Sequence, residues 1–148
     1  MKEHTILVVD DNPGDAMLTE RAFRKSSIAS TLMIVHDGQE ALDYLWGKGN
    51  HAGRDLRDMP ALILLDINLP RVSGHDVLRR IRSDPRTRRL PVVMLTSSCE
   101  DGEVGRCYDA GANSYIQKPI DFKRFVEVAH ELSTYWLTIN ESPPAIDR

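Results

Sequence analysis

Four apolar segments of this chain each end in side chains that could carry out metal-assisted phosphoryl chemistry. In an open parallel sheet, residues at the carboxyl ends of the strands line one shared crevice. Carboxylates there would bind Mg²⁺ as hard oxygen ligands, and a hydroxyl and an ammonium group would hold phosphoryl oxygens. The segments and their end residues are ILVV before Asp10 and Asp11, ALILL before Asp66, PVVML before Thr96, and SYIQ before Lys118.

The elements that must position these side chains alternate regularly along the sequence. Continuous runs of Val, Ile and Leu are typical of strands buried on both faces of a parallel sheet, and segments with helical periodicity separate them. This alternation predicts an α/β domain with a five-stranded doubly wound parallel sheet and five helices on its two faces. Predicted strands cover 5–10, 31–36, 61–66, 92–96 and 114–117, and predicted helices cover 13–27, 38–46, 74–83, 100–110 and 122–139.

Local signals mark the helix ends. Asn12 suits an N-cap and Pro13 the first helical position, while Gly111 suits the end of the fourth helix. In the first helix, Leu18 is expected on the apolar side that faces the sheet. His75 begins the third helix outside the crevice, and we expect it to be solvated.

The length of 148 residues suits one domain with a single core. We expect this domain to span residues 1–140, including an extended last helix, and the Pro-rich segment 141–148 (ESPPAIDR) to form a flexible tail. The segment 47–60 is a polar, glycine-rich loop that is longer than most strand–helix connections. The sequence thus predicts one domain with one long loop and a tail.

Composition excludes several classes of protein. The net charge of −3 makes no electrostatic case for nucleic acid or a membrane surface. The arginine-rich stretch 79–89 lacks the interleaved aromatic residues of a nucleic-acid site, and no apolar run approaches the ~20 residues of a spanning helix. The N-terminus has no signal-peptide layout, and Cys99 and Cys107, eight apart on the fourth predicted helix, form no disulfide framework. We expect a cytoplasmic protein.

The sequence resembles the receiver domains of two-component response regulators, which have the CheY-like fold. The resemblance covers about residues 4–135, and the separations between key residues match as well: 30 from Asp66 to Thr96 and 22 from Thr96 to Lys118. The resemblance implies the flavodoxin-like strand order 2-1-3-4-5, with the crevice at the switch point. The motifs that carry it are VVDDNPGD (8–15), VHDGQEAL (35–42), LLDINLP (64–70), MLTSS (94–98) and DAGANSYIQKP (109–119).

The resemblance also implies a role for each residue of the crevice. Asp66 is the expected phosphoacceptor, because an ionised carboxylate can attack phosphorus to give an aspartyl-phosphate. Asp10, Asp11 and Asp66 are expected to bind Mg²⁺ together with the backbone carbonyl of Asn68. Thr96 would donate its hydroxyl to a phosphoryl oxygen. Lys118 would pair with the phosphoryl charge, aimed inward by a cis peptide bond to Pro119.

Three further positions have roles by the same resemblance. Tyr115 lies where the family carries an aromatic switch residue, which turns inward when phosphate draws the Thr96 hydroxyl toward itself. The surface of the fourth helix, fifth strand and fifth helix would change as a result. Asn68 and Ser98, two residues beyond Asp66 and Thr96, are expected to flank the attacking water and tune self-dephosphorylation.

The loop 47–60 and the phrases NPGDAMLTERAF and HDGQEALDYL resemble one subgroup of the family. Its members are stand-alone regulators encoded beside phytochrome-type photoreceptor histidine kinases. A sensor histidine kinase, of phytochrome type by this narrower match, is therefore the expected partner. Trp136, Leu137 and Ile139 extend past the usual receiver length, and exposed clustered apolar residues usually mark an interface. We expect them to extend a homodimer surface.

Three other readings compete with a receiver that signals by phosphorylation. A phosphohydrolase of the haloacid-dehalogenase kind needs a second Asp two residues after the nucleophile, where this chain has Asn68. A flavin module needs a phosphate loop after the first strand, and Asp10 and Asp11 would repel a phosphate there. A receiver that signals by constitutive dimerisation without phosphate stays open. The leading interpretation is a signalling switch that takes a phosphoryl group on Asp66 and hydrolyses it slowly, rather than a metabolic enzyme.

Overall fold

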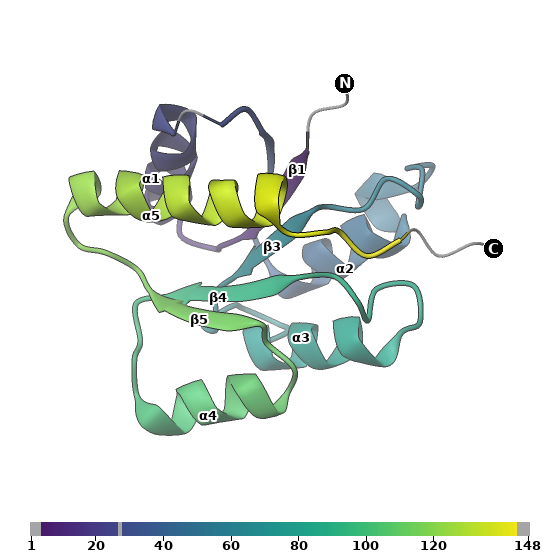
Figure 1. Cartoon of the computed structure of the whole chain (residues 1–148). Helices are drawn as coiled ribbons and strands as arrows, with labels where there is room; N and C mark the ends of the chain where they lie inside the picture. The colour runs from purple at the N-terminus through teal and green to yellow at the C-terminus, as the bar shows by residue number, and fades with distance from the viewer. Residues whose placement is uncertain (1–3, 27, 145–148) are drawn as a thin grey trace.

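The computed structural model describes residues 4–26 and 28–144, which form an α/β fold around one parallel sheet (Figure 1). The strand order is β2-β1-β3-β4-β5, and every neighbouring pair is parallel. The predicted strands, their order and the fold class are therefore confirmed. The strands are β1 (Thr5–Val9), β2 (Thr31–Val35), β3 (Leu62–Leu65), β4 (Val92–Thr96) and β5 (Ser114–Gln117).

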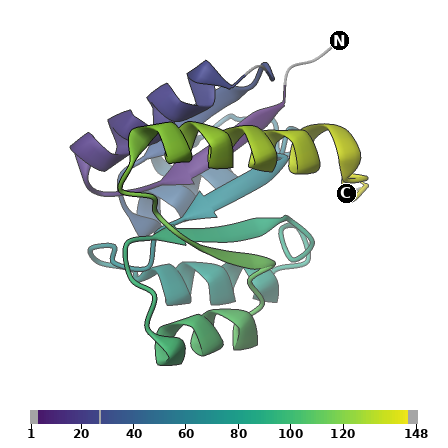
Figure 2. The same ribbon diagram turned by 60° about the vertical axis from the view of Figure 1, so that its left-hand side comes forward.

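Two layers of helices enclose the sheet. Helices α1 and α5 cover one face, while α2, α3 and α4 cover the other, as Figures 1 and 2 show from two directions. The helices are α1 (Pro13–Lys25), α2 (Gly38–Trp46), α3 (Gly74–Ser83), α4 (Asp101–Asp109) and α5 (Phe122–Ser133), with a short 3-10 turn η1 (Gly49–His51) and a π-helical segment η2 (Thr134–Ile139).

Burial explains why the central strands read as unbroken apolar runs. Every residue of β3 and β4 is buried, whereas the edge strands β2 and β5 are mostly half-buried. Each face of the sheet has its own apolar cluster, one with Phe23 and Phe125 beneath α1 and α5, the other with Leu42, Leu78 and Cys107 beneath α2, α3 and α4. Strands covered by helices on both sides have no face left for polar residues.

The helix ends follow the local signals. The Asn12 side chain accepts a hydrogen bond from the Asp15 backbone N–H, with Pro13 at the first turn. Gly111 follows α4 with φ of +106°, a backbone conformation that glycine adopts without strain. Leu18 differs from the prediction, because it is 41% exposed. The inward side of α1 is supplied by Ala16, Thr19, Ala22 and Phe23.

The long loop after α2 is organised around Arg54. Its Nε donates to the Tyr44 carbonyl at 2.7 Å and its Nη1 to the Asp58 carbonyl at 2.6 Å. The guanidinium also stacks over the Tyr44 ring at 4.1 Å from the ring centre. One arginine thus satisfies carbonyl groups that a polar loop would otherwise leave to solvent.

Part of the π-helical segment η2, which continues the last helix, packs against the domain's own core. Leu137 is buried and belongs to the apolar cluster beneath α1 and α5, and Trp136 packs against the same cluster. Ile139 and Tyr135, in contrast, are 63% and 48% exposed. The prediction that all three residues of the Trp136, Leu137 and Ile139 set face outward is therefore wrong for Leu137. Of the predicted tail, residues 145–148 lie outside the described residues.

None of the helices in the described part of the chain is both long enough and apolar enough to cross a membrane.

Candidate functional site

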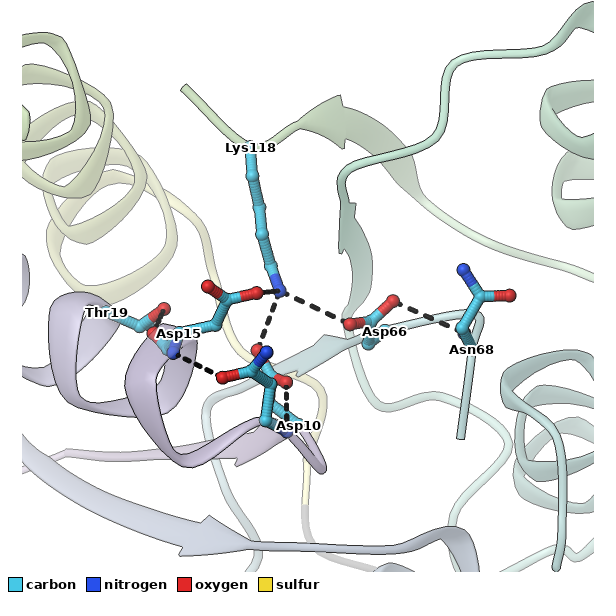
Figure 3. A network of polar contacts seen from close by, with 7 residues as sticks. Asp10, Asp15, Thr19, Asp66, Asn68 and Lys118 are labelled. Atoms are coloured by element: carbon cyan, nitrogen blue, oxygen red, sulfur yellow. Dashed lines mark hydrogen bonds and ion pairs between the residues drawn. The ribbon is translucent and has the colours of Figure 1, made fainter. Parts of the chain in front are cut away.

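The carboxyl ends of four parallel strands meet at one edge of the sheet. The register pairs Val9 with Leu65 and Thr96 with Gln117, so the residues that follow the strands converge. Asp10 follows β1, Asp66 follows β3, Thr96 ends β4 and Lys118 follows β5. Figure 3 shows the Lys118 side chain reaching down toward the carboxylates of Asp10 and Asp66.

Asp10, Asp11 and Asp66 form a cluster that could hold a metal ion. One oxygen of each carboxylate lies within 4.8 Å of the others. Asp10 and Asp66 are buried and Asp11 is exposed, so one side of the cluster opens to solvent. Three carboxylates at such separations repel one another, and a divalent cation removes that cost. The donor set is all oxygen and suits a hard cation such as Mg²⁺ or Mn²⁺.

Lys118 balances part of this negative charge. Its Nζ lies 2.7 Å from Asp10 Oδ2 and 3.2 Å from Asp66 Oδ2, and its side chain is only 9% exposed. Burial by itself would lower the pKa of Lys118, but the Asp10 hydrogen bond and the charge of Asp66 outweigh burial and raise it. Burial raises the pKa of Asp10, against the lowering effect of Lys118. The ammonium group is therefore held charged between two buried carboxylates.

Asp15 is a third partner of Lys118 that the sequence reasoning missed. Its Oδ2 lies 3.4 Å from Nζ, and its side chain is 40% exposed. The residue sits in the first turn of α1, where the Asn12 cap fixes the direction of the helix. The motif DDNPGD contained the signal, because the turn at Asn12–Pro13 brings the first helical carboxylate back over the crevice (Figure 3).

Thr96 carries a buried hydroxyl without a hydrogen-bond partner among the described residues. The residue is fully buried at the end of β4, and its backbone carbonyl accepts from the Lys118 N–H at 2.8 Å. An unpaired buried hydroxyl costs stability, and such groups call for a functional explanation. Its place beside the crevice makes it available to donate to a bound anion.

The loop after β3 is packed tightly behind Asp66. The Asn68 backbone N–H donates to Asp66 Oδ1 at 3.3 Å, while the Asn68 side chain is exposed. A Cβ on Gly74 would lie 2.2 Å from the Asp66 carbonyl oxygen, so only glycine allows α3 to begin here. Close packing thus fixes the backbone of Asp66, and the Asn68 N–H and the Lys118 ammonium contact its carboxylate. The role of the Asn68 carbonyl as a metal ligand stays a prediction.

Tyr115 lies on β5 with its ring against the apolar cluster beneath α2, α3 and α4. Its hydroxyl donates to the Ser98 carbonyl at 2.8 Å, and burial raises the pKa of this hydroxyl. The side chain thereby ties β5 to the loop between β4 and α4, two residues beyond Thr96. Its predicted role as a switch needs a second state and stays a prediction.

Three further expectations about individual residues are wrong. The peptide bond between Lys118 and Pro119 is trans, since no bond between described residues is cis; the ammonium reaches its carboxylates with a trans bond. His75 is buried rather than solvated, because α3 and α4 pack together there and its Nε2 lies 3.5 Å from Cys107 Sγ. Cys99 is exposed and precedes α4, whose first residue is Asp101, rather than lying on that helix.

Comparisons with known proteins agree with this geometry. The chain is 41% identical to the probable methanogenesis regulatory protein FilR2 of Methanothrix harundinacea over 138 residues, covering 93% of this chain and 86% of that protein. It is 33% identical to the response regulator Rcp1 of Synechocystis over 140 residues, covering 95% and 93% respectively. The crystal structure of RcpA, a phosphorylated cyanobacterial phytochrome response regulator, superimposes with a TM-score of 0.87 at 34% identity, covering 96% of this chain and 99% of that one.

A family model described as the response regulator receiver domain matches residues 6–130. This range contains each residue of the crevice described above, from Asp10 to Lys118. The chain therefore belongs to the response regulator receiver family, the signalling switches of two-component systems, and its relatives include phytochrome response regulators.

Proposed function

We propose that this receiver takes a phosphoryl group from the phosphohistidine of a sensor kinase onto Asp66. The observation that carries the proposal is the placement of the Lys118 ammonium between the buried carboxylates of Asp10 and Asp66. Such a cluster is a receptor for a phosphoryl group, because it offers an attacking oxygen, a counter-charge and carboxylates for a cation in one crevice.

The transfer follows from the roles of these atoms. A carboxylate oxygen of Asp66 attacks phosphorus, the bond between phosphorus and the histidine nitrogen breaks, and the electron pair returns to the imidazole. Lys118 moves its hydrogen bond from the carboxylates to a phosphoryl oxygen, and the Thr96 hydroxyl donates to another. Mg²⁺, held by Asp10, Asp11, Asp66 and the Asn68 carbonyl, would neutralise charge on the phosphoryl oxygens.

Two relatives support a phosphoryl group and a divalent metal ion as the groups that this crevice binds. RcpA has been crystallised in a phosphorylated state. Rcp1 has been crystallised in a form with bound Mn²⁺, at 32% identity to this chain and a TM-score of 0.84. Manganese and magnesium share a preference for oxygen ligands, so the acidic cluster here suits either ion.

The surface beside the crevice supports a protein as the phosphoryl donor. Asp15, Lys118, Leu18 and Phe122 border a cavity of about 220 Å³. Ile120 lies on its rim and is fully exposed. An apolar side chain next to a reactive carboxylate suits docking of an apolar helix face that presents the phosphohistidine. We propose a sensor histidine kinase as this partner, of phytochrome type by analogy with the relatives.

The output is proposed to be a change at the surface of α4, β5 and α5. Phosphorylation would draw the Thr96 hydroxyl toward the phosphoryl group and change the packing space beside Tyr115. Tyr135, Trp136 and Ile139 extend this surface at the end of the chain, and we propose that they take part in a homodimer.

The test of phosphoryl transfer uses acetyl phosphate and Mg²⁺ as a small-molecule donor, with intact-protein mass spectrometry as the readout. We expect one phosphoryl group on the wild type, none on Asp66→Asn and one on the control Asp15→Asn, which alters a partly exposed partner of Lys118. A wild type that stays unmodified, or an Asp66→Asn variant that is labelled equally, would contradict the proposal.

The test of the output is molar mass by light scattering with Mg²⁺, before and after beryllofluoride is added. We expect the mass to rise from monomer to dimer in the wild type and not in Asp66→Asn. A dimer under every condition would instead point to constitutive assembly.

A further inference from the structure

A second cavity lies at the edge of the sheet where the strands begin, opposite the crevice. Its volume is about 270 Å³, and its walls come from the loop before β3, the loop before β4 and the segment 142–144. The residues directly before β1, β3 and β4 line it, whereas the crevice lies where the same strands end (Figure 1). Strands of four or five residues separate the two sites by roughly 13–17 Å. The cavity is therefore distinct from the site around Asp66.

Both loops that form this cavity are held in place by arginine side chains outside its lining. In the loop before β3, Arg54 donates to the Asp58 carbonyl at 2.6 Å. In the loop before β4, Arg82 donates to the Leu90 carbonyl at 2.7 Å and to the Arg88 carbonyl at 3.0 Å. Hydrogen bonds within the protein thus set the shape of the cavity, and a largely preformed shape is usual for a ligand site.

The lining combines apolar residues with positive charge. Leu90 and Pro91 are buried and supply apolar surface. Arg57, Arg86 and Arg89 also line the cavity, and no Asp or Glu among the described residues does. In a chain whose net charge is −3, three arginines without a lining carboxylate are a local excess of positive charge. Such a lining is complementary to a ligand that carries both an apolar part and an anionic group.

Two of these arginines have N–H groups available for an anion. The Arg86 Nε and Nη2 donate to the Asp84 carboxylate at 3.0 and 2.7 Å, which holds the guanidinium in one orientation. This pair leaves the Arg86 Nη1 without an acceptor among the described residues. Arg89 is exposed and has no ion-pair partner in the described part of the chain. Guanidinium N–H groups are donors suited to carboxylate and phosphate oxygens.

We propose that this cavity binds a small organic anion. Its apolar body lies against Leu90 and Pro91, and its carboxylate or phosphate group pairs with Arg86 and Arg89. The volume is just below the ~300–1,000 Å³ of typical ligand pockets, so the ligand is about the size of one aromatic ring with its acidic group. The inference does not depend on phosphoryl transfer to Asp66, because the two sites lie at opposite ends of the strands.

The experiment follows backbone amide NMR signals of the full chain in EDTA while a probe is added. The probes are benzoate and phenyl phosphate, with benzyl alcohol as a neutral ring and inorganic phosphate as an anion without a ring. We expect saturable shifts in the loops before β3 and β4 with at least one aromatic anion, and the tighter of the two identifies the acidic group. Benzyl alcohol and inorganic phosphate should each bind at least about threefold more weakly, because each lacks one half of the match.

Variants test the two arginines directly. Arg86→Gln and Arg89→Gln should each weaken binding about three- to tenfold, as expected for one charged contact at a partly exposed site. Arg79→Gln is the matched control, because Arg79 is 65% exposed, pairs with Asp76 and does not line the cavity. Arg89→Gln has no ion pair to lose, so it tests the site even where Arg86→Gln loosens its loop.

Four results would overturn the inference. They are the absence of saturable shifts, shifts centred on the crevice at 66–68 and 96–98, benzyl alcohol binding as tightly as both aromatic anions, and equal affinity in Arg89→Gln and the wild type. Because the titration contains no phosphoryl donor and no divalent ion, its failure would leave the proposed role of Asp66 untouched.

Discussion

At the scale of single residues, the crevice holds opposite charges close together in a buried place. Asp10 and Asp66 are buried carboxylates, and Lys118 is the buried cation that faces both of them. Removing one member of a buried charge cluster leaves the others uncompensated in a poorly solvated place. The same side chains that suit a phosphoryl group therefore also influence the stability of the fold.

Lys118→Met tests this balance. We expect the free energy of unfolding to fall by about 2–4 kcal/mol without divalent ions, because two buried carboxylates lose their counter-charge. Added Mg²⁺ should restore part of the loss. Urea unfolding with EDTA and with Mg²⁺ measures both effects. Asp15→Asn is the matched comparison and should change stability by less than about 1 kcal/mol, because Asp15 is 40% exposed. A Lys118→Met protein as stable as the wild type would contradict this account.

His75 predicts a dependence of stability on pH. Burial, and then the charges of Arg106 and Arg79, lower the pKa of His75 below its ordinary 6.5. The unfolded chain therefore binds a proton on His75 at higher pH than the folded protein does, so stability falls as the pH drops below 6.5 toward the folded pKa. Urea unfolding between about pH 7.5 and pH 5.5 should show a smaller loss in His75→Gln than in the wild type. Equal losses in the two proteins would show that His75 is not the responsible group.

At the scale of elements, the first residues of α2 and α3 make close contacts with backbone near the crevice. Helix α3 begins at Gly74, directly against the Asp66 carbonyl, and α2 begins at Gly38, where a Cβ would lie 2.3 Å from the Val72 carbonyl oxygen. Helix α4 is different, because Gly102 has open space around it. The starts of α2 and α3 are therefore packed closely against neighbouring backbone, whereas Gly102 lies on an open face of α4.

A pair of glycine variants tests this contrast. Gly74→Ala should lower the free energy of unfolding by about 2–4 kcal/mol, because its methyl group overlaps backbone that cannot move without shifting Asp66. Gly102→Ala should raise it by about 0.5–1 kcal/mol, because alanine favours the helix. Thermal or urea unfolding of both variants is the measurement. Similar effects of the same sign at the two sites would refute the proposed difference in packing.

At the scale of the whole molecule, the segment 134–139 has one buried side and one exposed side. Leu137 enters the apolar cluster beneath α1 and α5, whereas Ile139 remains exposed near the end of the described chain. A helix that continues past the sheet can therefore complete the core on one side and offer apolar area to another molecule on its opposite side.

The variants Leu137→Ala and Ile139→Ser separate the contribution of this segment to the core from its proposed contribution to a dimer. Leu137→Ala should cost about 2–3 kcal/mol of unfolding free energy, as expected for a buried leucine. Ile139→Ser should change stability by less than about 0.5 kcal/mol but reduce the dimeric fraction seen with beryllofluoride. Urea unfolding and light scattering on the same samples make the comparison. A fully dimeric Ile139→Ser protein would argue against this surface as the interface.

The sequence by itself determined where the strands lie, which functional side chain follows each strand, and which carboxylates form the acidic cluster. The buried strands β1 and β3 are apolar along nearly their whole length, so their ends are visible in the sequence at Asp10 and Asp66. The half-buried edge strand β5 ends less sharply before Lys118. Because parallel strands share one edge for their carboxyl ends, the meeting of these three residues followed from the alternation alone.

Only the tertiary structure decided which side chains are covered by distant segments. Asp15 reaches Lys118 across 103 residues of chain, and His75 is buried because α4 packs over it through Cys107. Leu137 is buried by the cluster under α1 and α5, although its local pattern equally suits an exposed helix end. Local patterns report the preference of a segment for helix or strand, whereas burial and charge pairing depend on neighbours that only the packed fold brings together.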